Sequence, residues 1–293
     1  MRHSGYRMAC GYERLKLFLL QFQTLNQTHV THKRHMNENG LRILTYNIHK
    51  GFTVGNRRFV LHQIREALLA ADADLMFLQE MQGEHRHHQQ KIADWPVLPQ
   101  LEFLAENNWP FHVYGKNAVY KAGHHGNAIL SKHPFQCWEN INVSPFSWAS
   151  RSLLHGVIRV PQAACGHLHE TALDLHIVCI HFGLTGKERR LQLSKLCARI
   201  DSHVPHEAPL IIAGDFNDWL GQAERFFHDR LGLQEIFRAT HGRYARSFPA
   251  WLPFLPMDRI YYRGLTPLSC ERLAYAPWFS LSDHAPLAAT FTL

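Results

Sequence analysis

The stretch Ala208–Asp218, APLIIAGDFND, joins a short run of apolar residues directly to a group of carboxylate and carboxamide side chains. An apolar run of this length, bounded by proline and glycine, is typical of a strand that is buried on both faces. The polar residues Asp215, Asn217 and Asp218 would then lie at the end of that strand. Strand ends of this kind are rigid and open onto a crevice, so binding and catalytic sites are commonly built there.

The same arrangement recurs along the chain, with carboxylates, carboxamides or imidazoles at the ends of apolar runs. Tyr46-Asn47 follows LRILT, Gln79-Glu80 follows DLMFL, His181 follows HIVCI, Asp258 opens DRIYY, and Ser282-Asp283-His284 precedes the final PLAATFTL. One such residue alone is more often a cap, a turn residue or a structural group than a functional one. Six endings in one chain, all with oxygen or imidazole groups and none with cysteine, favour a shared site.

Helical and strand-like patterns follow one another in mixed order. Apolar residues recur at helical spacing in 59–71 and 187–200, and another helix is expected to begin at Gln222. Several neighbouring strands have no helix between them, for example those on either side of the expected turn 121–126, KAGHHG. The sequence therefore predicts an α/β fold with mixed sheets, in one domain that extends from residue 41 to residue 293.

Residues 1–40 do not continue this pattern and are predicted to form an N-terminal extension. Residues 1–35 are open to three interpretations: a disordered leader, a short amphipathic helix, or an upstream segment from a misassigned start codon, since Met36 offers a second start. A large part of the formal charge of +7 lies in this extension, so the net charge does not favour nucleic acid over lipid as a partner.

The cysteines and the apolar runs indicate the cellular compartment of the protein. No CxxC pair occurs, and no apolar run approaches the roughly 18 residues that a membrane span needs. Reduced thiols then indicate a cytoplasmic protein, with attachment to the periphery of the inner membrane left open.

The oxygen-rich strand ends suit a hard divalent cation, Mg²⁺ with Mn²⁺ as a substitute, better than structural zinc. Magnesium usually binds only one or two carboxylates of a protein and keeps water and substrate phosphate oxygens as its other ligands. The remaining histidine and aspartate residues then fit proton transfer or contact with a phosphoryl group.

Together these motifs resemble those of a known family. The ordered set TYNI, LQE, GNAILSKHP, HFG, GDFN, MDRIYY and LSDHAPL is similar to the endonuclease/exonuclease/phosphatase superfamily, and within it to a bacterial subgroup of metal-dependent hydrolases. The similarity runs in order through the whole chain from residue 41 onward. It implies a DNase I-like fold, which is a four-layer α/β/β/α sandwich of two packed mixed β-sheets. It also implies Mg²⁺-dependent cleavage of a phosphate ester by in-line attack of water.

The resemblance further implies roles for single residues. The residues on the metal side would be Asn47, Glu80 and Asp283. The catalytic residues would be His181, Asp215, Asn217, Asp258 and His284. Among these, Asp215 would position or deprotonate the attacking water, Asn217 would hold that water or a phosphate oxygen, and Asp258 would orient His284 against the scissile phosphate. The resemblance gives His181 a role in transition-state stabilisation or leaving-group protonation, and it leaves open which histidine acts as acid or base.

Two residues outside these motifs are weaker candidates for binding substrate phosphate. Arg151 carries a planar guanidinium that suits phosphate oxygens, and Asn127 lies in the GNAIL segment. Histidine clusters at 85–88 and 124–125 are interpreted first as solvated loops. The alternatives are that these histidines bind substrate phosphate at the rim of the active site, or that they form a second metal site.

The substrate stays open on sequence grounds. Nucleic acid, membrane lipid, inositol phosphates and small phosphodiesters all fit a phosphate-ester hydrolase, and no obligate protein partner is evident. The aromatic residues Phe248, Trp251, Phe254, Trp278 and Phe279 could stack on bases, meet a lipid surface or pack in the core. A catalytically silent phosphate-binding or interaction module on the same fold is the alternative to an enzyme, and the complete set of eight site residues favours the enzyme.

Overall fold

The apolar runs of the sequence form two six-stranded sheets in the computed structural model, which describes residues 40–144, 151–162 and 171–293. Leu41–Leu293 is one compact unit. The expectations for residues 1–35 lie outside the described residues.

The first sheet is mixed and has the strand order β11-β12-β1-β2-β4-β3. Its strands are β1 (Gly40–Asn47), β2 (Leu75–His85), β3 (Phe111–Tyr120), β4 (Gly123–Ser131), β11 (Thr266–Arg272) and β12 (Leu287–Thr292). Strands β1 and β2 are parallel, whereas β4 is antiparallel to both β2 and β3. Helix α2 (Leu61–Ala71) links β1 to β2, as a parallel pair requires, and it occupies the range that the apolar spacing predicted.

The second sheet is also mixed, with the order β5-β6-β7-β8-β10-β9. Its strands are β5 (Phe135–Asn142), β6 (Ser152–Gln162), β7 (Thr171–His181), β8 (Leu210–Asp215), β9 (Gln234–Glu235) and β10 (Asp258–Arg263). Strands β7 and β8 are parallel, and helix α5 (Gly186–His203) connects them. Thr185 and Glu188 form a capping box that fixes the start of α5.

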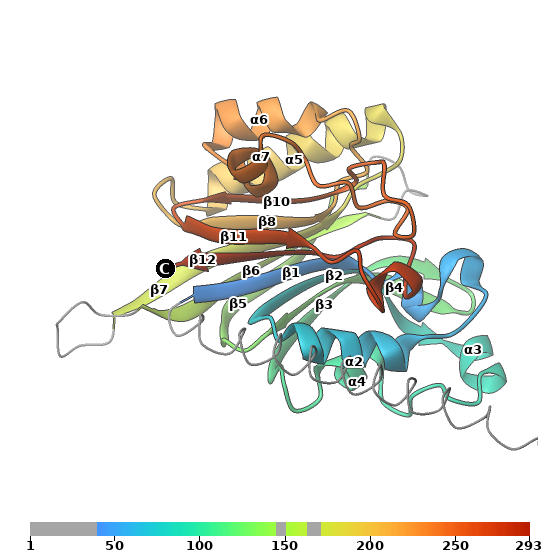
Figure 1. Ribbon diagram of the computed structural model, residues 1–293. Helices are drawn as coiled ribbons and strands as arrows, with labels where there is room; N and C mark the ends of the chain where they lie inside the picture. The colour runs from blue at the N-terminus through green and yellow to red at the C-terminus, as the bar shows by residue number, and fades with distance from the viewer. Residues whose placement is uncertain (1–39, 145–150, 163–170) are drawn as a thin grey trace, which may run out of the picture. The chain divides into compact units, whose positions relative to one another are not determined.

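Helices cover the outer face of each sheet (Figure 1). The remaining helices are α3 (Arg86–Lys91), α4 (Gln100–Ala105), α6 (Gln222–Leu231) and α7 (Ile236–His241), with 3₁₀ turns η1 (His49–Gly51), η2 (Val54–Asn56) and η3 (Trp278–Ser280). Helices α2 and α4 pack on the first sheet, and α5 and α6 pack on the second. None of the helices in the described residues is long and apolar enough to cross a membrane.

The two sheets pack face to face through fully buried side chains such as Phe77, Ile177 and Ile211. Each side chain of this kind stabilises the fold by roughly 1.5–3 kcal/mol relative to an exposed position. Together with the outer helices, this core completes the four-layer α/β/β/α sandwich. The predicted fold class is therefore confirmed.

One segment differs from the expected arrangement. The sequence predicts a turn over 121–126, whereas β4 already begins at Gly123 and pairs with β3 and with the end of β2. A Cβ atom at Gly123 would lie only 1.7 Å from the backbone oxygen of Glu84, so glycine allows this close approach. His124 and His125 consequently lie on a strand.

Strand pairing brings the polar strand ends together. The register of the parallel pairs places Asn47 opposite Gln79 and His181 opposite Asp215. The antiparallel pair β8–β10 places Asp258 opposite Asp215. The residues that end β1, β7 and β8 and begin β10 therefore meet at one edge of the sandwich.

A buried carboxyl group caps helix α7 away from this edge. Oε2 of Glu235 accepts a hydrogen bond from the backbone N–H of Arg238 at 2.9 Å, and Glu235 is only 3% exposed. Burial raises the pKa of Glu235 from its ordinary value of 4.5 to about 7, and the charge of Arg259 opposes the rise only in part. The fold therefore favours the protonated carboxyl. The contribution of protonated Glu235 to the free energy of unfolding is complete below about pH 4.5 and is lost as the pH rises through about 7.

Glu235→Gln is expected to remove this pH dependence, because glutamine keeps an accepting oxygen and carries no charge. The free energy of unfolding of E235Q relative to the wild type should rise by up to about 3 kcal/mol between about pH 4 and about pH 8. Denaturant unfolding across this range measures the difference. E207Q, at a glutamate whose side chain is 98% exposed, controls for net charge. A constant difference between E235Q and wild type would contradict a protonated Glu235.

Candidate active site

Asp215, the last residue of β8, is the centre of the polar cluster. It is 1% exposed, and its Oδ2 atom is approached by three side chains from other segments. The carboxamide Nδ2 of Asn47 lies 3.2 Å away, Nε2 of His181 lies 3.5 Å away, and Nε2 of His284 lies 3.8 Å away. The structure thus brings together residues that lie 168 positions apart in the chain, as the strand-end pattern predicted.

The turn after β8 is held by its own polar groups. Oδ1 of Asp215 accepts a hydrogen bond from the backbone N–H of Asn217 at 2.9 Å, which is an Asx-type turn. The Asn217 side chain donates to the backbone oxygen of Phe182 at 3.0 Å, so the ends of β7 and β8 are tied together. Gly214 has φ = 149°, and a Cβ atom there would lie 2.1 Å from the oxygen of Ile180. Glycine is therefore needed immediately before Asp215.

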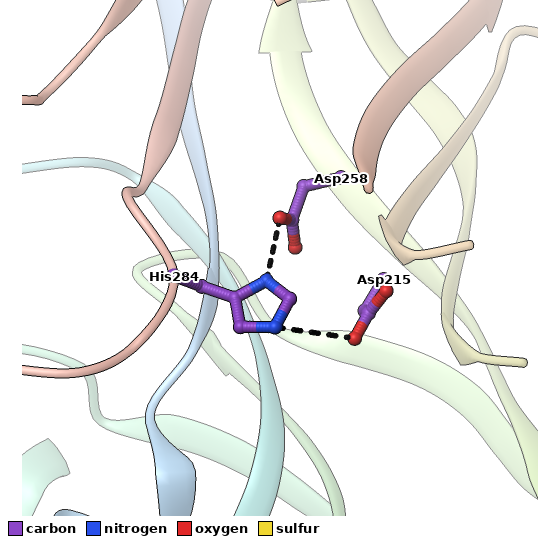
Figure 2. A group of neighbouring side chains, drawn as sticks. All are labelled: Asp215, Asp258 and His284. Carbon is purple, nitrogen blue, oxygen red and sulfur yellow. Dashed lines mark hydrogen bonds and ion pairs between the residues drawn. The ribbon is translucent and has the colours of Figure 1, made fainter. Parts of the chain in front are cut away.

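His284 and Asp258 form a buried pair beside Asp215 (Figure 2). Nδ1 of His284 lies 2.8 Å from Oδ2 of Asp258, which leaves Nε2 directed toward Asp215. The backbone N–H of Asp258 donates to the hydroxyl oxygen of Ser247 at 3.1 Å. Asp258 thus orients the imidazole, as carboxylates that accept a hydrogen bond from a functional histidine commonly do.

The two histidines carry different charges. Burial lowers the pKa of His181, and the charge of Arg151 lowers it further, to about 4, despite the opposing effect of Asp215. Burial would also lower the pKa of His284, but the charges of Asp258 and Asp215 outweigh it and raise the pKa to about 10. At neutral pH, His181 is a neutral imidazole and His284 is an imidazolium.

The surroundings of Asp215 make its carboxylate a stronger base. Burial raises the pKa of its carboxyl group, and the positive charge of His284 is the largest opposing influence. A carboxylate with a raised pKa in contact with an imidazolium is suited to general-base work near neutral pH.

A pair of carboxylates, Glu80 and Asp283, lies beside the middle of β2. Glu80 does not end its strand as the sequence predicted, because β2 continues to His85 past an irregularity between Leu78 and Met81. Oδ1 of Asp283 lies 3.3 Å from Nδ1 of His49, and Oε2 of Glu80 lies 4.0 Å from the same nitrogen. Oε2 of Glu80 also lies 2.9 Å from the ammonium of Lys50. Glu80 has φ = 54°, a left-handed conformation that costs a non-glycine residue free energy and is common at functional sites.

The charge states of these carboxyl groups suit a hard cation. Burial works against ionisation of Glu80, but the positive charges of His181, which is protonated in the acid range where Glu80 titrates, and of Lys50 outweigh it, so the pKa of Glu80 lies well below its usual range. Burial opposes ionisation of Asp283 as well, and the hydrogen bond from His49 leads the effects that lower its pKa. Two ionised carboxylates that both approach Nδ1 of His49 offer the oxygen ligands that a hard divalent cation such as Mg²⁺ prefers.

A different group could also hold a metal ion on distance alone. Donor atoms of Asp215, Asp258 and His284 all lie within 4.8 Å of one another. However, Nδ1 of His284 is already hydrogen-bonded to Asp258, and the imidazole is cationic, so a metal ion would have to displace that proton. A cation at Glu80 and Asp283 would replace the contacts of Lys50 and His49, but both carboxyl groups are ionised and neither contact lies in the buried His284–Asp258 pair, so these two carboxylates are the better cation ligands.

Of the two weaker candidates, Arg151 contacts a residue next to the cluster, whereas Asn127 has a structural contact. Nε of Arg151 lies 3.4 Å from the backbone oxygen of Phe182, the residue after His181. Asn127 on β4 is fully buried and donates to the backbone oxygen of Ser152 on β6 at 3.2 Å, so it links the two sheets. Contact of either residue with substrate phosphate stays a prediction.

The histidine clusters are not loops, contrary to the first interpretation. His85 ends β2 and stacks on His88 of α3 with ring centroids 3.5 Å apart. On β4, Nδ1 of His124 lies 3.0 Å from the hydroxyl of Tyr114, and burial together with the charge of Lys50 lowers the pKa of His125 to about 4. Within the described ranges, no group of three donor atoms that could share a metal ion includes these histidines.

Sequence reasoning assigned no role to three residues that the structure places in the site. His49 and Lys50 face the carboxylate pair, and the hydroxyl of Ser282 donates to the backbone oxygen of Asn47 at 2.7 Å. His49 and Lys50 follow Asn47 directly in TYNIHKG, which was the available signal. Their direction could not be predicted, because it depends on positive φ angles of 45° and 59°.

The fold and the site together define a member of a family of hydrolases that act on phosphate esters. Residues 44–284 match the model of the Endonuclease/Exonuclease/phosphatase family, and the chain belongs to that family. The resemblance that the motifs indicated is therefore confirmed.

Comparison with individual proteins extends this result. The protein YbhP of Escherichia coli strain K12 is 41% identical over 252 residues, which cover 86% of this chain and 96% of YbhP. The structure of D. rerio TDP2 complexed with single strand DNA product has 20% identity and a TM-score of 0.57, and the match covers 87% of this chain and 99% of that one. A mannosyl-6-phosphatase of Bacteroides thetaiotaomicron has 16% identity and a TM-score of 0.62, with 86% and 100% covered. At such identities the two structures show a shared fold alone.

Asp258→Asn is expected to lower the pKa of His284 by about 1–3 units, because it removes the carboxylate that outweighs burial. NMR titration of isotope-labelled histidine in metal-free protein measures this pKa. D229N is the matched control, since Asp229 forms an exposed pair with His228 at 3.1 Å. A wild-type His284 that titrates near its ordinary value would contradict the charge assignment.

Proposed function

We propose that this protein is a Mg²⁺-dependent phosphodiesterase, which hydrolyses its substrate by in-line attack of an activated water. The observation that carries the proposal is the contact of one buried carboxylate, Asp215, with a neutral imidazole and with an imidazolium. The carboxylate pair Glu80 and Asp283 lies beside this group. Such an arrangement supplies a base, two imidazoles of different charge and a cation site within one cluster.

In the proposed reaction, Asp215 accepts a proton from the attacking water. The water oxygen forms a bond to phosphorus while the bond from phosphorus to the leaving oxygen breaks. Asn217 and Asn47, which already hold the Asp215 carboxylate, fix the direction in which its oxygens point. A base held in the right orientation makes the reaction of water with the phosphoryl group effectively unimolecular, which lowers the activation free energy.

His284 is suited to the charge that develops on the phosphoryl oxygens. Its imidazolium is held by Asp258 and can donate a hydrogen bond from Nε2–H to an anionic phosphoryl oxygen while it keeps its proton. Preorganised donors of this kind, directed at the transition state, account for a large part of catalysis in many enzymes. His181 is neutral and its Nε2 lies 3.5 Å from Oδ2 of Asp215, so it can accept the proton that Asp215 has taken from the water and pass it to the leaving oxygen.

A divalent cation, when bound, would supply Lewis-acid polarisation of the phosphoryl group. Glu80 and Asp283 would hold it, with Asn47 as a further oxygen donor. Lys50 faces Glu80, and its positive charge offsets the mutual repulsion of the two carboxylates. The substrate is proposed to be nucleic acid, a phospholipid or a small phosphodiester.

Asp215→Ala and His284→Ala are each expected to lower kcat for bis(p-nitrophenyl) phosphate by about 10²–10⁴-fold, because they remove the base and the main positive contact to phosphate. Initial rates in Mg²⁺ measure the effect, and circular dichroism checks the fold. H284Q keeps the size of the side chain if H284A fails to fold, and D229N is the surface control. Full activity in D215A would contradict the site assignment.

Glu80→Gln is expected to weaken cation binding by about tenfold or more, since it removes one of two charged ligands. Chelation with EDTA should abolish hydrolysis, and added Mg²⁺ or Mn²⁺ should restore it. Electron paramagnetic resonance of Mn²⁺ measures binding without relying on activity. E84Q is the matched control, because Glu84 lies on the same strand and its side chain is 51% exposed. Equal Mn²⁺ affinity in E80Q and E84Q would argue against this cation site.

A further inference from the structure

Large apolar side chains are exposed on the loops that leave the catalytic strand ends. They belong to the loops after β7 and β8 and to the segment before β10, and their exposed fractions range from 40% to 69%. They are Leu184, Trp219, Leu220, Trp251, Leu252 and Phe254. Single exposed apolar residues are ordinary on a protein surface, whereas a group of six around one site points to a binding surface.

Three of the six form the tip of a short hairpin. Phe248 and Leu255 pair as an antiparallel bridge, with hydrogen bonds of 3.1 and 2.8 Å between their backbones. Trp251, Leu252 and Phe254 lie within this hairpin and are 63%, 61% and 56% exposed. Because the backbone on both sides is hydrogen-bonded, the apolar tip is a fixed part of the fold.

The hairpin is attached directly to the catalytic segment. The backbone N–H of Ala250 donates to the oxygen of Asp283 at 2.7 Å, and the ring centroid of Phe248 lies 5.0 Å from that of His284. The long segment between α7 and β10 that carries the hairpin runs at the edge where the strand ends meet (Figure 1). Whatever binds the hairpin tip is therefore placed next to the candidate active site.

The other three residues lie on the loops after His181 and Asp215. Leu184 and Leu220 are 64% and 69% exposed, and Trp219 is 40% exposed. The guanidinium of Arg189 lies 5.1 Å from the ring centroid of Trp219 and also donates to the backbone oxygen of Leu184 at 2.6 Å. Arg189 therefore joins these two loops into one apolar rim beside the site.

The charge around the rim is positive. Residues 236–257 contain Arg238, Arg243 and Arg246 and no aspartate or glutamate, and of the three arginines Arg238 is ion-paired with Glu224 at 2.9 Å. Arg243 and Arg246 are exposed and lie just before the hairpin, whereas its tip carries no charge. Basic groups followed by an apolar tip match the interface of a bilayer, where anionic phosphates lie above the acyl chains.

The types of apolar residue in the rim favour a bilayer over single-stranded nucleic acid as the binding partner. Bases bind by stacking on aromatic rings, which leucine side chains cannot provide. Leu184, Leu220 and Leu252 make up half of the rim and are among its most exposed members. Aliphatic side chains gain free energy when they enter acyl chains.

We propose that this apolar rim inserts into the surface of an anionic phospholipid bilayer and brings a lipid phosphodiester to the site. The choice of a lipid as substrate rests on the proposed function. Binding of the rim to the bilayer does not depend on hydrolysis and is tested separately.

The test is co-sedimentation of the full chain with phosphatidylcholine vesicles that contain phosphatidylglycerol. The variant W251S/L252S/F254S is expected to partition into vesicles at least about tenfold less than the wild type, since three inserting side chains are removed. The matched control V97S/W138S/L268S changes exposed apolar residues before α4, on β5 and on β11, and it should bind as the wild type does. Brominated lipid should quench Trp fluorescence less in W251F than in the wild type.

Hydrolysis of bis(p-nitrophenyl) phosphate by W251S/L252S/F254S should equal that of the wild type, because none of the three residues touches the catalytic cluster. Failure of the wild type to bind vesicles, or equal binding by the hairpin variant, would overturn the proposal. Binding of single-stranded DNA that the hairpin variant loses, without vesicle binding, would assign the rim to nucleic acid instead. Vesicle binding by a protein that hydrolyses no phosphodiester would support the rim and overturn the proposed function.

Discussion

The carboxylate of Asp215, buried at the end of β8, is the constraint on which the rest of the site depends. An ionised carboxyl group costs several kcal/mol to bury unless hydrogen bonds and opposite charge compensate. The compensation comes from β1 through Asn47, from β7 through His181, and from the last loop through His284. Each partner belongs to a different segment, so the site exists only when these segments hold their native register.

The packing of the two sheets supplies that register. Asn47 ends a strand of the first sheet and Asp215 ends a strand of the second, so their hydrogen bond crosses the interface between the sheets. The hydroxyl of Ser282 adds a link from the last loop to the backbone of Asn47. Close-packed interiors yield little to strain, and the apolar core therefore keeps the distances among these polar groups nearly constant. Local environment then gives His181 and His284 different charges although both face one carboxylate.

The surroundings of the site combine two unlike surfaces. The catalytic cluster is polar and nearly buried, whereas the loops that leave the same strand ends expose apolar residues such as Leu220 and Trp251. Exposed side chains of this kind add little to folding stability and favour association. A rigid hairpin joined to Asp283 places this rim where a substrate would enter, which links the proposed membrane contact to the proposed chemistry.

The sequence by itself determined an α/β fold with mixed sheets, because apolar periodicity reports burial, and the family resemblance implied the four layers. Asp215, Asp258 and His284 could be selected because they are adjacent to buried runs, whereas His49 and Lys50 could not. The sequence did not determine that His124 and His125 lie on a strand, since that depends on the close approach of Gly123 to Glu84. It also did not determine which tryptophans are exposed. The structure buries Trp278 against Tyr46 in the core, whereas Trp251 is exposed. Register, positive φ angles and exposure arise from contacts between distant segments, and only the tertiary structure decides them.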